Sequence, residues 1–380
     1  MKGWCAGLLV ASIAWLGAIP GLARPVRIGR HVEVPHGVSA DHPWVGEDGG
    51  AARRGAARYP VPSDAPSVAW EVRVGGGSAR TPIVSTKGPL VVATSHTVAG
   101  LAPAGEFRWS HRLHLPQGTP ALMPELNFLV ATRRGDLVRV ARDGEVVDRL
   151  SVGAGIAAAP LVLDDGSAVV ATRDAALVRL DAQGRRMFRT ALPQVSRRPP
   201  AWDGSRIVVA AGTELHLLSA EGHVRARVAM PELAVAGPAV ALDGTLWVLG
   251  GKGTLSAFDR HGRVRARADV GRVAASSPLV VGPDGAAYVG TRDGELVCIG
   301  PTGTERWRLE GEGVFLAGLS IDPDGVILGT TVQGSLVAVE PDGSVRWRVS
   351  TRPRSSSDPV VAADGTVYVG TSAGTVQAFR

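Results

Sequence analysis

Beyond residue 80 the sequence is built from one unit that recurs about every forty residues. The residues that open successive units are Pro82, Pro120, Pro160, Pro200, Pro238, Pro278, Leu319 and Pro359, so neighbouring units begin 38 to 41 residues apart. Self-similarity at such a period indicates structural repeats that stack on one another. The content of one unit therefore determines the fold of most of the chain.

The internal plan of the unit is clearest at residues 358–379, where three apolar segments alternate with turns: DPVVAA, then DG, then TVYVGT, then SAG, then TVQAF. In the unit before it, the three segments are followed by a further turn, PDG, and a fourth segment, SVRWRV. Four short strands per forty residues are typical of a propeller blade, whereas tetratricopeptide and ankyrin repeats are helical. The 49 glycines also disfavour long helices. We predict an all-β, eight-bladed β-propeller of four-stranded antiparallel blades; a seven-bladed count stays open if the second or fourth unit is degenerate.

The two ends of the repeat region complement each other. The last unit stops after its third strand at Phe379 and Arg380, while a lone segment at 68–74, VAWEVRV, resembles a fourth strand and precedes the first unit. We expect this N-terminal strand to complete the eighth blade and close the ring, because closure removes exposed strand edges.

Residues 1–23 combine an early cation, Lys2, with an apolar run that ends in small residues, which predicts a signal peptide. A membrane span is the alternative, but Gly17 and Pro20 interrupt the run. Cys5 precedes the run, so we expect no lipid anchor at a lipobox and a periplasmic or secreted protein. Residues 24–66 show no strand or helix period and are assigned to an extended arm rich in Pro, Gly and Arg, followed by the propeller at 67–380.

Charge and cysteine content exclude some classes of function. The net charge is +6, but the cations are scattered over the repeats, so we expect no nucleic-acid partner. Cleavage of the signal peptide would leave Cys298 as the single cysteine, which rules out an internal disulfide. No segment after the signal peptide is apolar enough to span a membrane, and we expect a monomer.

A tryptophan stands four residues after a turn glycine in three units, at Trp109, Trp307 and Trp347, and Trp70 occupies the equivalent place in the closing strand. With these tryptophans, residues 68–380 resemble the PQQ-like (pyrroloquinoline-quinone-type) propeller repeat. The resemblance implies that such indole rings dock between adjacent blades. A flat apolar ring with one N–H is suited to that structural role, and we assign these residues no chemistry.

Quinone-dependent alcohol dehydrogenases share this repeat, and the resemblance implies a site for the quinone and Ca²⁺ on the propeller axis. Their adjacent cysteine pair is missing here, and Asn127 is the single asparagine for an Asn-containing Ca²⁺ site. We find no catalytic constellation and no metal site, and the Asp-Gly pairs suit hairpin turns better than calcium loops. We therefore expect no enzyme and no cofactor; PQQ with Ca²⁺, or another small ligand on the axis, remains the alternative.

The antiparallel strand order places the connections between units and the turns between second and third strands on one side of the ring. That side, called the connection side below, collects arginines, and arginine is favoured at protein interfaces. The candidate partner-binding residues are Arg133, Arg134, Arg197, Arg198, Arg352 and Arg354. The sequence thus favours an exported scaffold that resembles BamB and binds a protein partner in the cell envelope, with outer-membrane assembly components as candidate partners.

Overall fold

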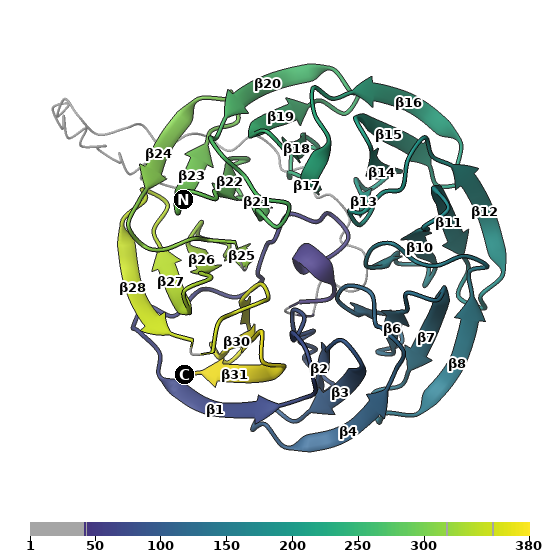
Figure 1. Ribbon diagram of the computed structural model, residues 1–380, viewed down its shortest axis with the longest axis horizontal. Helices are drawn as coiled ribbons and strands as arrows, with labels where there is room; N and C mark the ends of the chain where they lie inside the picture. The colour runs from purple at the N-terminus through teal and green to yellow at the C-terminus, as the bar shows by residue number, and fades with distance from the viewer. Residues whose placement is uncertain (1–41, 43, 317, 352) are drawn as a thin grey trace, which may run out of the picture. The chain divides into compact units, whose positions relative to one another are not determined.

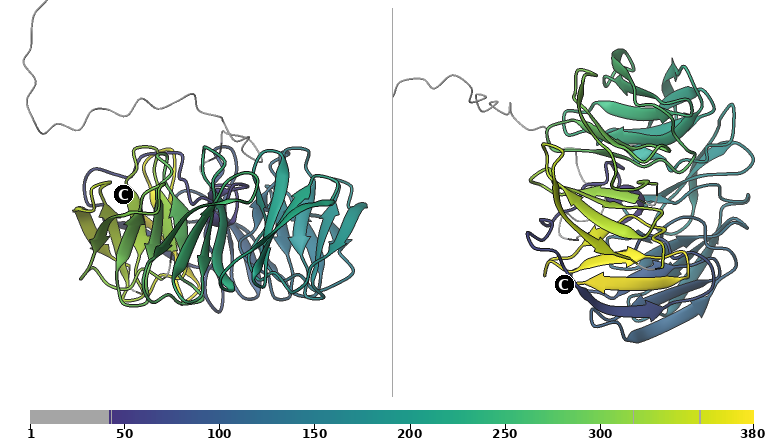
Figure 2. Two further views of the ribbon diagram at one scale, coloured as in Figure 1. Left: turned by 90° about the horizontal axis from the view of Figure 1, so that it is seen from above. Right: turned by 60° about the vertical axis from the view of Figure 1, so that its left-hand side comes forward.

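The chain folds into a ring of strands, as the computed structural model shows (Figure 1). The structure describes residues 42, 44–316, 318–351 and 353–380, all of which belong to one compact unit. The strands of this unit form eight antiparallel sheets around a central axis. Seen from the side, the sheets stand next to one another around that axis (Figure 2). The predicted eight-bladed, all-β propeller is confirmed.

The blades follow one another in chain order, each running from an inner strand at the axis to an outer strand at the circumference. Blade 1 contains β2 (Leu90–Ala93), β3 (Thr97–Leu101) and β4 (Phe107–Arg112), and a single bridge between Ile83 and Val91 stands for its inner strand. Blade 2 contains β5 (Ala121–Leu122), β6 (Phe128–Ala131), β7 (Asp136–Val140) and β8 (Val146–Ser151). Blade 3 contains β9 (Leu161–Val162), β10 (Ala168–Ala171), β11 (Ala176–Leu180) and β12 (Arg186–Ala191). Blade 4 contains β13 (Ala201–Trp202), β14 (Arg206–Ala211), β15 (Glu214–Ser219) and β16 (Val224–Ala229).

The second half of the ring repeats this plan. Blade 5 contains β17 (Ala234–Val240), β18 (Leu246–Gly250), β19 (Thr254–Phe258) and β20 (Val264–Asp269). Blade 6 contains β21 (Leu279–Val281), β22 (Ala287–Gly290), β23 (Leu296–Ile299) and β24 (Glu305–Leu309). Blade 7 contains β25 (Gly318–Ile321), β26 (Ile327–Thr330), β27 (Ser335–Val339) and β28 (Val345–Ser350). Blade 8 contains β29 (Val360–Val361), β30 (Val367–Gly370) and β31 (Thr375–Phe379).

The outer strand of blade 8 comes from the other end of the chain. Strand β1 (Val68–Arg73) pairs antiparallel with β31, with Val72 opposite Val376. The predicted closure of the ring by an N-terminal strand is confirmed, and Figure 1 shows the two chain segments side by side at the circumference. Closure hides the edge that β31 would otherwise expose.

Burial explains why these segments are strands. The second strands, such as FLVA at 128–131 and VYVG at 367–370, are buried at every position because neighbouring blades cover both faces of each sheet. The outer strands, such as VRARVA at 224–229, alternate between half-buried and exposed residues because one side of the outer edge meets solvent. The continuous apolar runs and the alternating runs of the sequence therefore mark inner and outer positions.

The tryptophans of the repeat lie between blades. The indole nitrogen of Trp307 in blade 6 donates to the carbonyl oxygen of Pro341 in blade 7, at 2.8 Å, and the ring covers Gly343. A Cβ at Gly343 would stand 2.8 Å from the Trp307 ring, and the φ of +92° also favours glycine there. The indoles of Trp70 and Trp109 bind the next blade in the same way, through the carbonyl oxygens of Pro103 and Arg142.

The described residues contain a single short 3₁₀ helix, η1 (Glu47–Gly49), in the arm. Figure 1 shows it near the centre of the ring. Among these residues no helix is long and apolar enough to cross a membrane. The signal peptide predicted at 1–23 lies outside the described residues.

Candidate functional site

The described part of the arm runs through the centre of the ring. Trp44 forms an antiparallel bridge with Val84 of blade 1, and Ala56 forms a parallel bridge with Ile321 of blade 7. Between these two bridges, backbone carbonyls of the arm accept hydrogen bonds from inner-strand amides of other blades. The pairs are Val45 with Leu122, Ala51 with Trp202, Ala52 with Val240, Arg54 with Val281 and Gly55 with Ile321, at 2.8 to 2.9 Å. The arm thus passes around the axis and is bonded to blades on all sides of it.

Small residues allow the arm to approach the inner strands this closely. A Cβ at Gly55 would stand 2.2 Å from Cγ1 of Val280, and the φ of Gly55 is +67°. Ala51 and Ala52 are buried against blades 3, 4 and 5. The Gly-Ala composition that gives this segment no period is therefore what lets it fit the axis.

The side chain of Arg53 holds the arm against blades 3 and 4 through hydrogen bonds. Its side chain is buried, and the guanidinium donates to the carbonyl oxygens of Glu47, Pro160 and Pro200 at 2.6 to 3.1 Å. It therefore ties η1 to the first residues of blades 3 and 4. Burial lowers the pKa of Arg53, and the nearby carboxylates of Asp48 and Glu47 oppose that shift.

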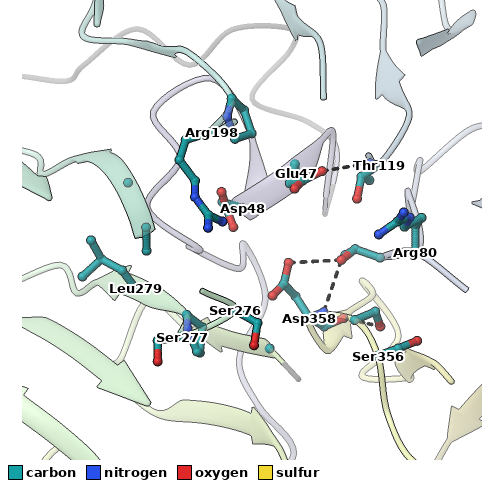
Figure 3. A pocket seen from close by; sticks show the side chains of 17 residues that line it. Glu47, Asp48, Arg80, Thr119, Arg198, Ser276, Ser277, Leu279, Ser356 and Asp358 are labelled. Atoms are coloured by element: carbon teal, nitrogen blue, oxygen red, sulfur yellow. Dashed lines mark hydrogen bonds between the residues drawn. The ribbon is translucent and has the colours of Figure 1, made fainter. Parts of the chain in front are cut away.

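A cavity of about 170 Å³ lies at the axis between the arm and the connections that lead into the blades. Glu47 and Asp48 of the arm form one wall, and Arg198, Ser276, Ser277 and Asp358 from three blade connections form others (Figure 3). In three of the connections, the backbone of the arm bonds an inner-strand residue that comes two or three positions after the last cavity residue. These bonded residues are Trp202, Val240 and Val281. The arm therefore closes the axis deeper in the ring, and the cavity belongs to the connection side.

Two carboxylates in the cavity have no ion pair within the described residues. Asp358 accepts a hydrogen bond from the Thr81 hydroxyl at 3.1 Å, and its carboxylate points across the cavity toward Asp48 and Arg198 (Figure 3). Burial, with the negative charges of Asp48 and Glu47, holds the pKa of Asp358 well above its usual range. Burial, with the charge of Glu47, raises the pKa of Asp48 to about 7, although Arg53 and Arg198 oppose this shift. Both anions lack a cation that fully compensates them.

Two arginines, Arg80 and Arg198, also line the cavity, and Arg198 is incompletely bonded. One terminal nitrogen of Arg198 donates to the carbonyl oxygen of Ala275 at 2.5 Å, while its Nε is buried and has no hydrogen-bond partner. Burial lowers the pKa of Arg198, and the charges of Asp48 and Glu47 oppose the shift. The cavity thus has the guanidinium of Arg198 on one side and incompletely compensated carboxylates on another.

Comparison with models of protein families identifies the family of this chain. A family model described as outer membrane protein assembly factor BamB matches residues 133–228 and 251–380, which is more than half of the sequence. The chain belongs to the PQQ-like propeller family. Individual curated proteins gave no match.

Solved structures of PQQ-like propellers share the fold with little sequence identity. BamB from Moraxella catarrhalis is 17% identical, with a TM-score of 0.66, and covers 83% of this chain and 100% of its own. A quinohemoprotein alcohol dehydrogenase from Comamonas testosteroni is 14% identical, with a TM-score of 0.72, covering 90% of this chain and 81% of its own. A europium-containing methanol dehydrogenase is 12% identical, with a TM-score of 0.70, covering 87% of this chain and 89% of its own. At such identities the likeness shows the fold alone.

The axial cavity does not fit the quinone of the PQQ-like enzymes. Its volume is close to that of an engineered cavity of about 150 Å³ that holds benzene, and PQQ is a far larger fused tricyclic acid. PQQ also carries several carboxylates, and the cavity that would receive them has three acids, Glu47, Asp48 and Asp358, against two arginines, Arg80 and Arg198. Within the described ranges no group of three or more His, Cys, Asp or Glu side chains could hold a metal ion. The arm, which is bonded to inner strands around the axis, leaves only this small cavity between itself and the blade connections that line it.

The arginines predicted for partner binding divide into two groups in this PQQ-like propeller. Arg133 and Arg134, in the turn between β6 and β7, are exposed, as are Arg197 and Arg354 in connections between blades. Arg198 differs, because its guanidinium is half-buried and lines the axial cavity. Arg352 lies outside the described residues.

The sequence reasoning missed Glu47, Asp48, Arg53 and Asp358 as site residues. The arm places a pair of acids and a pair of arginines, in GEDGGAARRG, among residues with little side chain. Charges in such a segment require partners elsewhere, and that is the signal from which the axial site could have been suspected. No signal marked Asp358, which precedes a blade-opening proline in a serine-rich connection.

Proposed function

We propose that this protein is an exported, non-enzymatic scaffold that binds a protein partner in the cell envelope through its connection side. The observation that carries the proposal is a set of exposed arginines on that side, Arg133, Arg134, Arg197 and Arg354, for which the described residues provide no ion pair. Arginine is favoured at interfaces because its planar, weakly hydrated group makes several hydrogen bonds at once.

Family membership supports the cellular setting of the proposal. The matching family model is described as an outer membrane protein assembly factor, and a BamB structure shares the fold over its whole length. The segment at 1–23 has the pattern of a signal peptide. The envelope, and outer-membrane assembly components in particular, is therefore where we expect the partner.

The absence of a catalytic role is part of the proposal and rests on the axis. The arm passes through the axis, where the resemblance to quinone-dependent dehydrogenases implies a cofactor site, and it is bonded to the inner strands of several blades through backbone groups. The axial cavity beside the arm is small, and its charged lining consists of three acids and two arginines, Glu47, Asp48, Asp358, Arg80 and Arg198. A binding scaffold needs neither cofactor nor open channel.

Capture of partners from intact host cells tests the proposal. The tagged protein is crosslinked in its own host, and captured envelope proteins are identified by mass spectrometry. A variant with alanine at Arg133, Arg134, Arg197 and Arg354 is compared with one that carries alanine at Arg149, Arg186, Arg225 and Arg267, which are exposed arginines on outer strands. The two variants lose the same charge, so net charge cannot explain a difference between them.

We expect the wild-type protein and the outer-strand variant to capture the same defined complex, and the connection-side variant to lose it. Equal capture by the two variants would show that the connection side does not carry the binding. No reproducible partner for the wild-type protein would contradict the scaffold function itself.

A further inference from the structure

The axial cavity presents two opposite charges, Asp358 and Arg198, across one small space. On one side the carboxylate of Asp358 accepts from the Thr81 hydroxyl and has no cationic partner among the described residues. On another side the guanidinium of Arg198 lines the cavity, and one of its terminal nitrogens donates to the carbonyl oxygen of Ala275. A buried donor or acceptor without its partner is costly, and charged groups cost more than neutral ones. The cavity therefore favours a ligand that carries both a cation and an anion.

A bare metal ion does not meet these needs. Among the described residues, the acids that line the cavity do not form a group of three that could hold a metal ion. A hard divalent cation requires about six to eight oxygen ligands at short range. An ammonium group, in contrast, is satisfied by a carboxylate and one or two hydroxyls, and Ser276, Ser277 and Ser356 supply hydroxyls in the same cavity.

Size sets the limit on such a ligand. The cavity of about 170 Å³ slightly exceeds an engineered cavity of about 150 Å³ that holds benzene. A molecule with roughly as many heavy atoms as benzene fits, and a large cofactor does not. The lining offers Leu279 as its single large apolar side chain among mostly polar neighbours, so a mostly polar ligand is preferred.

We propose that the axial cavity binds a small zwitterion of the α-amino acid class, with its ammonium group on Asp358 and its carboxylate on Arg198. Figure 3 shows these two side chains facing the same space, with Asp48 beside Arg198 and the serine pair below. The ligand enters from the connection side, because the arm closes the axis deeper in the ring. This site is independent of partner binding, since the four exposed arginines proposed for that role are not among the cavity residues.

Raised carboxylate pKa values agree with this assignment. Burial and neighbouring negative charge raise the pKa of both Asp48 and Asp358, which is the response of anions that lack a counter-ion. A bound ammonium group would lower both values, so binding should release protons at a pH near 7. Proton release on binding is a signature that a non-specific surface interaction would not give.

Calorimetric titration of the purified mature protein with three matched probes tests the proposal. L-alanine is the zwitterion, ethylamine is the same skeleton without the carboxylate, and propionate is the same skeleton without the ammonium group. We expect saturable binding of L-alanine with release of protons into the buffer, and at least about tenfold weaker binding of the other two probes. Glycine and L-serine, which are close to alanine in size, are titrated as well.

Two variants locate the site. Asp358→Asn keeps the hydrogen bond with Thr81 but removes the charge, and Arg198→Gln removes the guanidinium. Each of these two variants should bind L-alanine about tenfold or more weakly than the wild-type protein. Asp64→Asn and Arg134→Gln, at exposed positions, should leave the affinity for L-alanine unchanged. Melting curves of all four variants verify that they fold.

Three results would overturn the proposal. One is the absence of saturable binding for L-alanine, glycine and L-serine at millimolar concentration. Another is ethylamine or propionate binding as tightly as L-alanine, which would show that one end of the zwitterion is not recognised. The third is unchanged affinity in folded Asp358→Asn and Arg198→Gln protein. None of these results bears on partner capture, so failure here is distinguishable from failure of the scaffold function.

Discussion

The indole nitrogen of Trp347 donates a hydrogen bond to the carbonyl oxygen of Pro62 at 2.8 Å. The equivalent tryptophans Trp70, Trp109 and Trp307 donate instead to the turn of the next blade. The arm therefore takes the place of a blade turn where it leaves the axis beside blade 7. A guanidinium nitrogen of Arg346 bonds the carbonyl of Val61 at the same point, and the Val61 amide bonds a carboxylate oxygen of Asp322.

Removal of this one indole hydrogen bond should loosen the arm. Trp347→Phe loses the donor to Pro62, whereas Trp307→Phe loses an equivalent donor to a blade turn, so each costs about 1 kcal/mol of stability. We expect trypsin to cut after Arg53, Arg54 or Arg58 faster in Trp347→Phe than in Trp307→Phe. Equal cleavage rates in the two variants would show that the Trp347 contact does not hold the arm.

The turn glycine beneath a docked indole should be more sensitive than a turn glycine without one. Gly343 and Gly365 both have positive φ, but a Cβ at Gly343 meets the Trp307 ring and a Cβ at Gly365 meets nothing within 4 Å. Gly365→Ala should cost about 1–2 kcal/mol from backbone strain alone. Gly343→Ala should cost about 1–3 kcal/mol more because of the steric clash, as measured by denaturant unfolding. Similar losses for both would refute the docking role of the glycine.

The buried guanidinium of Arg53 should be essential to the position of the arm. Arg53→Ala leaves three carbonyl oxygens without their donor, two of them buried, so we expect a loss of about 2 kcal/mol or more in unfolding free energy. Arg134→Ala, at an exposed position, should change it by less than about 0.5 kcal/mol. Thermal and denaturant unfolding measure both variants. A loss in Arg53→Ala as small as in Arg134→Ala would mean that these contacts add nothing.

Stability should fall as the pH rises from about 4 to 7, because burial and the charge of Glu47 raise the pKa of Asp48 from 3.8 to about 7. In that window the folded protein holds a proton that the unfolded chain releases, so protonation favours the folded state at low pH and the benefit is lost above pH 7. Asp358 acts in the same direction. Carboxylates with lowered pKa, such as Asp174 with its hydrogen bond from Thr172, lose stability only below about pH 3.8.

Asp48→Asn separates this effect from other titrations, because the amide mimics the protonated acid. Between pH 5 and pH 8 the wild-type protein should lose more unfolding free energy than Asp48→Asn does, by on the order of 1 kcal/mol or more. Denaturant titrations at the two pH values measure the unfolding free energy of both proteins. Identical losses in both proteins would place the folded-state pKa of Asp48 near its ordinary value.

The repeats could be predicted from the sequence because each blade carries its own local signals. Strand-forming segments alternate with Asp-Gly turns, and the missing fourth strand at Phe379 pointed to its replacement at 68–74. These signals are side-chain patterns within forty residues, which is the range over which periodicity is visible.

The path of the arm left no such pattern. Its contacts are made by backbone carbonyls that every residue has, to amides such as Trp202 and Ile321 that lie far along the chain. Arg198 shows the same limit for the site. The sequence placed it with Arg197 on one exposed face, whereas the chain at 197–199 turns one side chain outward and the other toward the axis. Arg197 thus lies on the exposed surface, whereas the adjacent Arg198 lines the axial cavity.

The arm passes through the axis of this propeller, and we expect that the axis does not serve as a quinone site. Titration of the purified mature protein with pyrroloquinoline quinone and Ca²⁺, followed by tryptophan fluorescence and by dye-linked oxidation of alcohols and sugars, tests this claim most directly. We expect no saturable quinone binding and no oxidation of any of these substrates. Saturable quinone binding accompanied by dye reduction would contradict it and would make this chain an enzyme.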